Sequence, residues 1–184
     1  MTKPVFTVEG HAIVCDNGCI ADQDGVMPEG LKNPADWAYF QTHLDTAAIV
    51  ITGRLGHQVH PNKPGRQRLV FTRSAGKGGF RREDDVAFLD PDEHDLINAF
   101  HIIAPGGGIV AVTGGTGIFD WFAERRLFHA FHLARARGFR IAKGRPLFSA
   151  TAQAEDHLAT IGLTLREQRM LDEKNRIELL RFAR

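Results

Sequence analysis

The sequence predicts an α/β fold: a central, mostly parallel sheet flanked by helices and closed by an antiparallel hairpin. Short apolar segments rich in β-branched residues recur without polar alternation, as in strands buried on both faces of a parallel sheet. Segments with helical spacing of apolar residues lie between them. Near the end, two polar-studded strand-like segments are joined by the turn Asp172-Glu173-Lys174-Asn175, which is typical of a hairpin.

Length and composition exclude several classes of protein. The 184 residues are enough for one domain with its own core, and we expect 1–184 to form it. A net charge of +1 argues against a nucleic-acid protein that works by bulk charge. Two cysteines, Cys15 and Cys19, are too few for a secreted disulfide scaffold, and we expect both to pack. No signal-like or membrane-length apolar segment is visible, so we expect a cytoplasmic protein without a membrane partner.

The expected strands follow from short apolar segments bounded by turn residues. In chain order they are 5–8, 12–15, 47–52, 68–72, 86–89, 109–113, about 129–133, 164–170 and 176–182.

Three helices are expected between these strands. The first begins after Asn33, with Asn33 as N-cap and Pro34 in the first turn, and carries Trp37, Phe40 and Leu44 on one face. The second opens at Asp90-Pro91-Asp92-Glu93 and buries Leu96, Ile97, Phe100 and Ile103. A third, shorter helix runs from about 116 to 123, directly after a pair of glycines.

Glycines, hydroxyls and arginines follow three of the expected strands. Ligands of open α/β sheets bind beyond the carboxyl ends of the parallel strands. Gly53-Arg54, Thr72-Arg73-Ser74 and Gly114-Gly115-Thr116-Gly117 occupy those positions. Glycine lets backbone N–H groups approach a phosphate, a helix N-terminus adds positive partial charge, and arginine grips a further phosphate. The convergence predicts a phosphorylated dinucleotide, although each motif alone is also typical of a tight turn or a solvated arginine.

Other motifs indicate no competing chemistry. No G-x-G-x-x-G follows a strand, and the glycine-rich segment 75–79 lacks the spacing of a phosphate-binding Walker loop. The histidines at 11, 57, 60, 129 and 132 match no metal-ligand spacing, so we expect no metal.

The order of motifs resembles the dihydrofolate reductase superfamily. The segments that carry the resemblance are 11–21, 27–28, 34–37, 49–54, 64–66, 69–72, 112–115 and 144–148. The last, Gly144-Arg145-Pro146-Leu147-Phe148, is especially similar to the reductase domain of bifunctional riboflavin-biosynthesis deaminase–reductases and its stand-alone relatives. The match runs through nearly the whole chain.

The resemblance implies NADPH as cofactor. Arg54 would reach the adenosine 2′-phosphate, and Thr72 and Arg73 would flank the same phosphate and its ribose. The other implied contacts are Ala12, Ile20 and Ala21 at the nicotinamide, and Gly53, Gly114, Gly115, Thr116, Gly117 and Ile118 along the rest of the cofactor.

Three residues are expected at the substrate. The resemblance implies that Asp36 binds the substrate ring and supports its protonation, whereas its position also suits a simple helix cap. Phe40 could stack on a heterocycle or pack in the core, and Arg66 matches a folate-tail arginine or a solvated loop residue. Phe119 and Ala134 stand where the family often has Tyr and Thr.

The resemblance thus implies an NADPH-dependent reductase of a small pyrimidine- or pteridine-type molecule. Its nearest named activity is 5-amino-6-(5-phosphoribosylamino)uracil reductase of riboflavin biosynthesis. Reduction of dihydrofolate or another pterin is the alternative, and a nucleotide-binding module without catalysis is the alternative from another class. The relatives suggest a homodimer.

Overall fold

The computed structural model describes residues 4–62 and 65–184. Its strands are β1 (Phe6–Cys15), β2 (Cys19–Ala21), β3 (Ile49–Gly53), β4 (Arg68–Phe71), β5 (Phe80–Glu83), β6 (Val86–Leu89), β7 (Gly108–Val112), β8 (Ala130–Ala136), β9 (Arg145–Pro146), β10 (Thr164–Asp172) and β11 (Ile177–Ala183). Its helices are α1 (Pro34–Thr46), α2 (Arg54–Val59), α3 (Leu96–Ile103), α4 (Thr116–Glu124) and α5 (Ala154–Thr160), with a 3₁₀ turn η1 (Glu29–Leu31).

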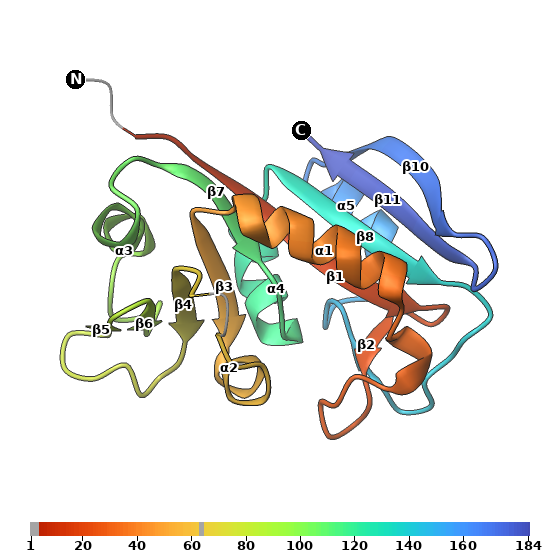
Figure 1. Ribbon diagram of the computed structural model, residues 1–184, viewed down its shortest axis with the longest axis horizontal. Coiled ribbons are helices and arrows are strands. Elements are labelled where there is room, and N and C mark those ends of the chain that lie inside the picture. The colour runs from red at the N-terminus through yellow and green to blue at the C-terminus, as the bar shows by residue number, and fades with distance from the viewer. Residues whose placement is uncertain (1–3, 63–64) are drawn as a thin grey trace.

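Nine strands form one sheet in the order β10-β11-β8-β1-β7-β3-β4-β6-β5 (Figure 1). The six strands from β8 to β6 run parallel, and β11, β10 and β5 join antiparallel at the two ends. The predicted mostly parallel sheet and C-terminal hairpin are confirmed. Because β8, β1, β7, β3, β4 and β6 share a direction, their carboxyl ends meet at one edge of the sheet.

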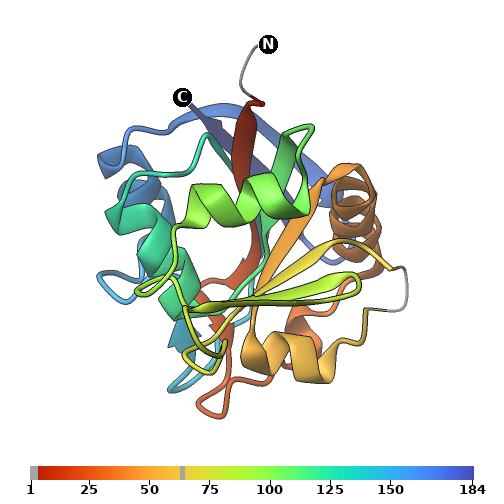
Figure 2. The ribbon, with the colours of Figure 1, turned by 90° about the vertical axis from the view of Figure 1, so that its left-hand side faces the viewer.

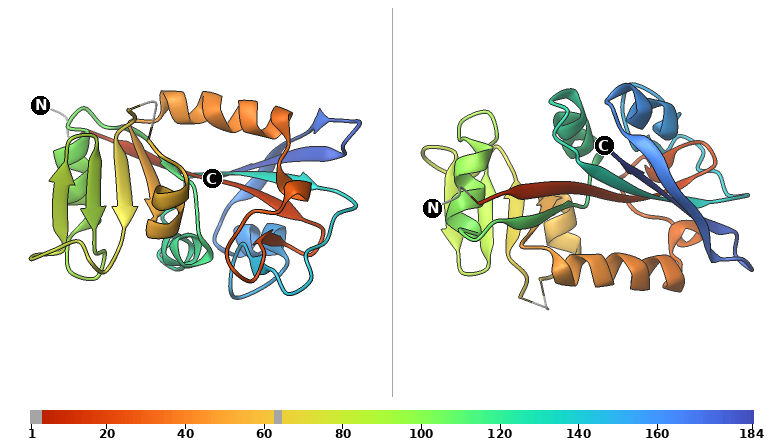
Figure 3. Two further views of the ribbon diagram at one scale, coloured as in Figure 1. Left: turned by 60° about the horizontal axis from the view of Figure 1, so that its bottom comes forward. Right: turned by 90° about the horizontal axis from the view of Figure 1, so that it is seen from above.

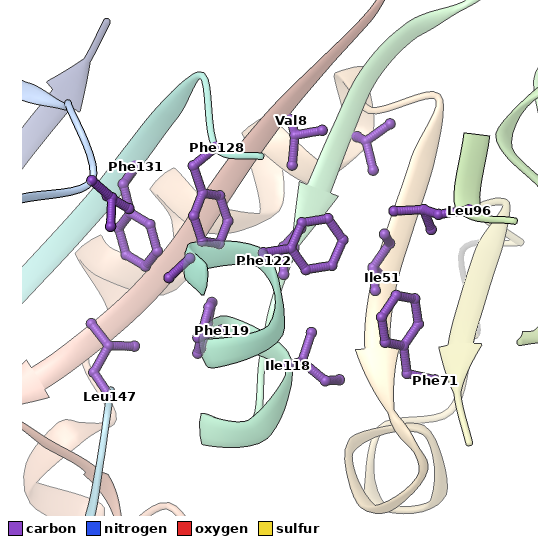
Figure 4. Packing of buried hydrophobic residues seen from close by; sticks show 14 of the residues in the cluster. Val8, Ile51, Phe71, Leu96, Ile118, Phe119, Phe122, Phe128, Phe131 and Leu147 are labelled. Atoms are coloured by element: carbon purple, nitrogen blue, oxygen red, sulfur yellow. The ribbon is translucent and has the colours of Figure 1, made fainter. Parts of the chain in front are cut away.

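Helices cover both faces of the sheet. Figure 3 shows α1 on one face and α4 and α5 on the other. The larger core lies on the second face, where α3, α4 and α5 bury apolar side chains against the strands. Figure 4 shows Phe119 and Phe122 of α4 among Val8, Ile51 and Phe131 of the sheet. At about 0.8 kcal/mol for each buried methylene, this packing fixes α4 on the sheet and with it the start of the helix.

Helix α1 buries fewer apolar side chains than the helices α3 and α4, but its N-terminus is well capped. The side chain of Asn33 accepts hydrogen bonds from the backbone N–H groups of Ala35 and Asp36, so its predicted role as N-cap is confirmed. Leu44 is buried against Val50 and Ala111, while Trp37 remains exposed. The helix therefore leaves part of its inner face uncovered near its N-terminus.

The structure corrects several expected boundaries. Apart from Val5, the segments 5–8 and 12–15 belong to one continuous strand, β1, in which Gly10 leaves room for the closely packed ring of Phe131. The second expected helix begins at Leu96 rather than at Asp90, since Asp95 supplies the N-cap and 91–93 form a turn. Ile97 is exposed on that helix instead of buried.

Short elements account for the rest of the difference. Helices α2 and α5, the turn η1 and the edge strand β5, visible beside β6 in Figure 2, were not expected. The small antiparallel sheet of β2 and β9 was not expected either. Within the described residues no helix has the length and apolar character needed to cross a membrane. Cys15 and Cys19 are both buried and unlinked, as expected.

Candidate functional site

A cavity of about 1340 Å³ lies along the carboxyl edge of the sheet and under α1. Its walls come from α1, α2, β2 with the loop that follows it, and the turn that joins β7 to α4. Most residues predicted for cofactor and substrate meet there. They are Ala12, Ile20, Ala21, Asp36, Phe40, Gly53, Arg66, Gly114, Gly115, Thr116 and Gly117.

The turn after β7 exposes backbone rather than side chains. Gly114 and Gly115 have φ values of +147° and +84°, which side-chain-bearing residues rarely adopt. A Cβ atom on either residue would meet nothing within 4 Å, so the space over the turn is open. Gly115 is the N-cap of α4, and the hydroxyl of Thr116 donates to the Pro146 carbonyl at 2.5 Å. The open backbone and the helix N-terminus together suit an anion.

A second cavity of about 270 Å³ holds another part of the predicted cofactor set. Thr72, Arg73, Gly117, Ile118 and Trp121 line it. Gly117 lines both cavities, so both lie beside the start of α4.

Arg54 departs from the expected arrangement. It is the first residue of α2, its side chain is exposed, and it lines neither cavity. Of the two arginines predicted for the 2′-phosphate, only Arg73 lies at a cavity.

Asp36 is an acid without a hydrogen-bond partner in the described part of the chain. Its backbone N–H donates to Asn33 Oδ1 in the first turn of α1, and its carboxylate makes no hydrogen bond to the helix. The carboxyl lines the main cavity, and burial raises its pKa to about 6. It can hold or release a proton near neutral pH.

Apolar side chains gather at the mouth of this cavity. Large apolar groups that are exposed to solvent and line it are Val26, Met27, Trp37, Leu55 and Val59. The Phe40 ring lies deeper, with its centroid 5.8 Å from that of Trp37. Exposed apolar side chains around a cavity mark a binding surface, and these suit a flat ring.

Arg66 is already engaged. Its Nη2 lies 2.5 Å from Asp45 Oδ1 and 2.9 Å from Gln41 Oε1, and both partners hold it against α1. It lines the cavity with its charge paired. Pro64 of the motif that carried this assignment lies outside the described residues.

A chain of hydrogen bonds crosses the sheet beneath α1. His132 Nε2 lies 3.2 Å from Glu9 Oε2, and the Tyr39 hydroxyl lies 2.6 Å from His132 Nδ1. The bond to His132 lowers the pKa of Glu9, so the carboxylate accepts and Nε2 donates, while Nδ1 shares its hydrogen bond with the Tyr39 hydroxyl. Burial raises the pKa of Tyr39 to about 12, which keeps the phenol protonated.

His11 stacks on His132, its neighbour across the parallel β1–β8 pair. The ring centroids are 4.4 Å apart and the planes differ by 12°. Burial, followed by the proximity of His132 and His43, lowers the pKa of His11 well below its usual range, and its Nε2 has no hydrogen-bond partner among the described residues.

Glu9, His11 and His132 bring possible metal ligands within 4.8 Å of one another. Parallel stacked rings cannot both point a lone pair at the same ion, and both His132 nitrogens already form hydrogen bonds. The arrangement therefore suits a buried hydrogen-bond network better than a metal centre.

Solved structures resemble the chain over almost its whole length, whereas no protein-family model and no curated protein sequence matches it. A riboflavin biosynthesis protein of Shewanella sp. PV-4 superposes with a TM-score of 0.71 at 15% identity, covering 97% of this chain and 98% of the other. Dihydrofolate reductase of Enterococcus faecalis, solved with NADP(H), gives 0.63 at 16% identity, covering 97% and 96%. The chain has a dihydrofolate reductase-like fold.

The same fold occurs in part of a larger protein. A diaminohydroxyphosphoribosylaminopyrimidine deaminase / 5-amino-6-(5-phosphoribosylamino)uracil reductase of Thermotoga maritima gives a TM-score of 0.63 at 14% identity. The match covers 98% of this chain and 56% of that one, so the chain spans little more than half of its length. The dihydrofolate reductase-like fold predicted from the motif order is confirmed.

Sequence reasoning missed the polar network under α1. His11 and His132 were considered only as metal ligands and set aside, because their contact depends on the register of β1 and β8. No local pattern signals it. Tyr39, three positions after Asp36 on the same helix, is the one member that helical spacing could have placed at the cavity.

Proposed function

We propose that the protein is an NADPH-dependent reductase of a small pyrimidine- or pteridine-type molecule, most like 5-amino-6-(5-phosphoribosylamino)uracil reductase. The observation that carries the proposal is the unpaired carboxyl of Asp36, with its pKa raised to about 6, in a cavity that begins at an open glycine turn. The fold shared with reductases supports the same reaction class.

The chain's own residues fit the cofactor. Gly114, Gly115 and the first turn of α4 would hold the pyrophosphate through backbone N–H groups. Thr72 and Arg73 would hold the adenosine phosphate in the second cavity, and Ala12, Ile20 and Ala21 would line the nicotinamide. When bound, NADPH supplies the hydride.

The residues on the substrate side of the cavity bind the substrate, orient it and supply its proton. Phe40 and Trp37 offer ring faces to a flat heterocycle, and the apolar mouth excludes water. Asp36 in its protonated form supplies the proton that the reduced atom or its neighbour takes up, and its carboxylate regains one from solvent.

The test measures the loss of NADPH absorbance with 5-amino-6-(5-phosphoribosylamino)uracil and with dihydrofolate in parallel. We expect turnover with the first compound above that with the second. Faster turnover of dihydrofolate would favour the pterin alternative, which the position of Asp36 also suits. Saturable NADPH binding without turnover of either would support a non-catalytic module, and absence of binding would refute the proposal.

A further inference from the structure

The smaller cavity carries more negative than positive charge, although it is the proposed place of the adenosine phosphate. Among the described residues, the charged groups that line it are Asp90, Asp92 and Arg73. Arg54, the second arginine expected there, lines neither cavity. Two acids and one base therefore share the wall of a site that is expected to hold an anion.

The two acids differ in what they can offer to a ligand. Asp90 is buried, and its Oδ1 accepts the backbone N–H of Asp92 at 3.1 Å. Its carbonyl oxygen accepts the N–H groups of Glu93 and His94, so Asp90 holds together the turn before α3. Asp92 is exposed, and its carboxylate has no hydrogen-bond or ion-pair partner within 4–62 and 65–184. Asp92 is therefore the acid that remains available to a ligand.

The basic side of the cavity is also available but single. Arg73 is exposed and forms no ion pair with any residue that the structure describes. A volume of about 270 Å³ corresponds to a sphere about 8 Å across, no more than a Debye length at physiological salt. A phosphate that Arg73 binds there also experiences the repulsion of Asp92, because the two side chains line the same small space.

The same carboxylate suits an adenosine that lacks the phosphate. A 2′-phosphate carries close to two negative charges at neutral pH, which a carboxylate repels. A free ribose instead presents hydroxyl groups, and a carboxylate accepts hydrogen bonds from them, as acidic residues do in NAD sites of other folds. Asp92 therefore favours the unphosphorylated ribose and opposes the phosphorylated one.

We propose that Asp92 determines cofactor specificity: it accepts a hydrogen bond from the adenosine ribose of NADH and repels the 2′-phosphate of NADPH, so that the protein uses both cofactors. The inference rests on the proposed function and deepens it, because the nicotinamide hydride then comes from either dinucleotide. Arg73 preserves a preference for NADPH, and Asp92 keeps that preference small.

Isothermal titration of NADPH and NADH measures the effect directly, since the two cofactors differ only in the 2′-phosphate. The preference is the dissociation constant of NADH divided by that of NADPH. We expect it to be about tenfold at most in wild type. Asp92→Asn should tighten NADPH binding about fivefold and weaken NADH binding about twofold, because the amide neither repels phosphate nor offers a charged acceptor.

Matched variants separate Asp92 from the general charge of its turn. Glu93→Gln removes an adjacent exposed carboxylate that lines neither cavity, and it should change the preference by less than about twofold. Arg73→Met should abolish the preference for NADPH, since only the repulsion remains. A wild-type preference above tenfold, an unchanged preference in Asp92→Asn, or an equal change in Glu93→Gln would overturn the inference.

Oxidation of the two cofactors distinguishes this inference from the proposed function. Initial rates are measured with 5-amino-6-(5-phosphoribosylamino)uracil and with dihydrofolate. Binding with the expected preferences, but without oxidation of either cofactor, would refute the reductase and support the role of Asp92. Oxidation of NADPH with a preference that Asp92→Asn leaves unchanged would refute the role of Asp92 and keep the reductase. Binding of neither cofactor would refute both.

Discussion

The raised pKa of Asp36 lowers the stability of the folded chain at neutral pH and suits the side chain to proton transfer. Its pKa of about 6 is above the ordinary aspartate value of about 4, and burial is the cause. The folded chain therefore binds more protons than the unfolded chain between those two pH values. The free energy of unfolding accordingly falls as pH rises from about 4 to about 6, and the penalty is fully present above that range.

Replacing Asp36 with Asn should stabilise the protein and lower its turnover. At pH 8 we expect the free energy of unfolding to rise by about 1–3 kcal/mol, because the buried charge is removed. Turnover should fall by about 100-fold or more, since the amide supplies no proton. In wild type, kcat/KM should fall as pH rises above about 6, and this limb should be absent in the variant.

Urea denaturation at several pH values and initial rates of NADPH oxidation measure the two effects. Asp156→Asn is the control, because Asp156 is exposed in the first turn of α5 and lines neither cavity. Unchanged turnover in Asp36→Asn would return this residue to a structural role, whatever its stability.

The sequence pointed to individual residues only where their role has a local signature. Asn33 could be placed as an N-cap from spacing, whereas Asp36 was placed by the resemblance to dihydrofolate reductases. His11 sits in a strand and looks like any residue there. Its surroundings arise from what the fold places beside it, namely the ring of His132.

At the level of elements, the start of α4 carries the clearest signal. The two glycines before it adopt positive φ, and the helix after it packs its aromatic face into the core. Gly117, inside the first turn, has an ordinary helical backbone and open space where a Cβ would be. The two kinds of glycine should respond to alanine in opposite directions.

Gly115→Ala should lower the free energy of unfolding by about 1–2 kcal/mol, because alanine is strained at a φ of +84°. Gly117→Ala should raise it by about 0.5–1 kcal/mol through helix propensity. The same Gly117→Ala methyl group projects toward the cavities and should weaken NADPH binding. Denaturation curves measure the two changes in stability, and cofactor titrations measure NADPH binding by Gly117→Ala. Tighter NADPH binding by this variant would contradict the placement of Gly117 beside the cofactor.

The bounds of the helices were harder to predict than the glycine-rich turns that follow the strands. Helix α2 was missed because its six residues, Arg54–Val59, include a glycine and carry no buried apolar face. Helix α3 was expected too early because Asp90-Pro91 has the composition of a helix start, yet Asp90 caps a turn and Asp95 caps the helix. Several acidic residues in succession offer more than one cap, and only packing chooses between them.

For the molecule as a whole, the two cavities lie beside each other at the start of α4, where both are lined by Gly117. The chain's two tryptophans lie one in each cavity, Trp37 in the main one and Trp121 in the smaller. Trp121 packs edge-on against Phe71 and under the guanidinium of Arg125. Each part of the site therefore has its own fluorescent reporter.

Fluorescence titration of single-tryptophan variants should separate the two ends of the cofactor. In Trp37→Phe, where Trp121 remains, both 2′,5′-ADP and NADPH should quench the emission. In Trp121→Phe, NADPH should quench while 2′,5′-ADP should not, because the adenosine end does not reach the main cavity. Quenching of Trp37 alone by 2′,5′-ADP would reverse the proposed orientation of the cofactor.

The overall architecture was predictable because buried parallel strands and their trailing glycines are local patterns. The strand order was not, since β1 lies between β7 and β8, which follow it by roughly a hundred residues along the chain. The polar network under α1 depends on that order and could not have been foreseen without it.

The central place of β1 has a consequence for synthesis on the ribosome. Strand β1 is made before both of its neighbours and cannot pair with either until 108–112 and 130–136 have been made, and the sheet then closes by contacts between distant parts of the chain. Such topologies fold slowly and expose apolar strands while they wait. Assembly of the centre of the sheet should therefore wait until 130–136 has been made, and β1 should need protection until then.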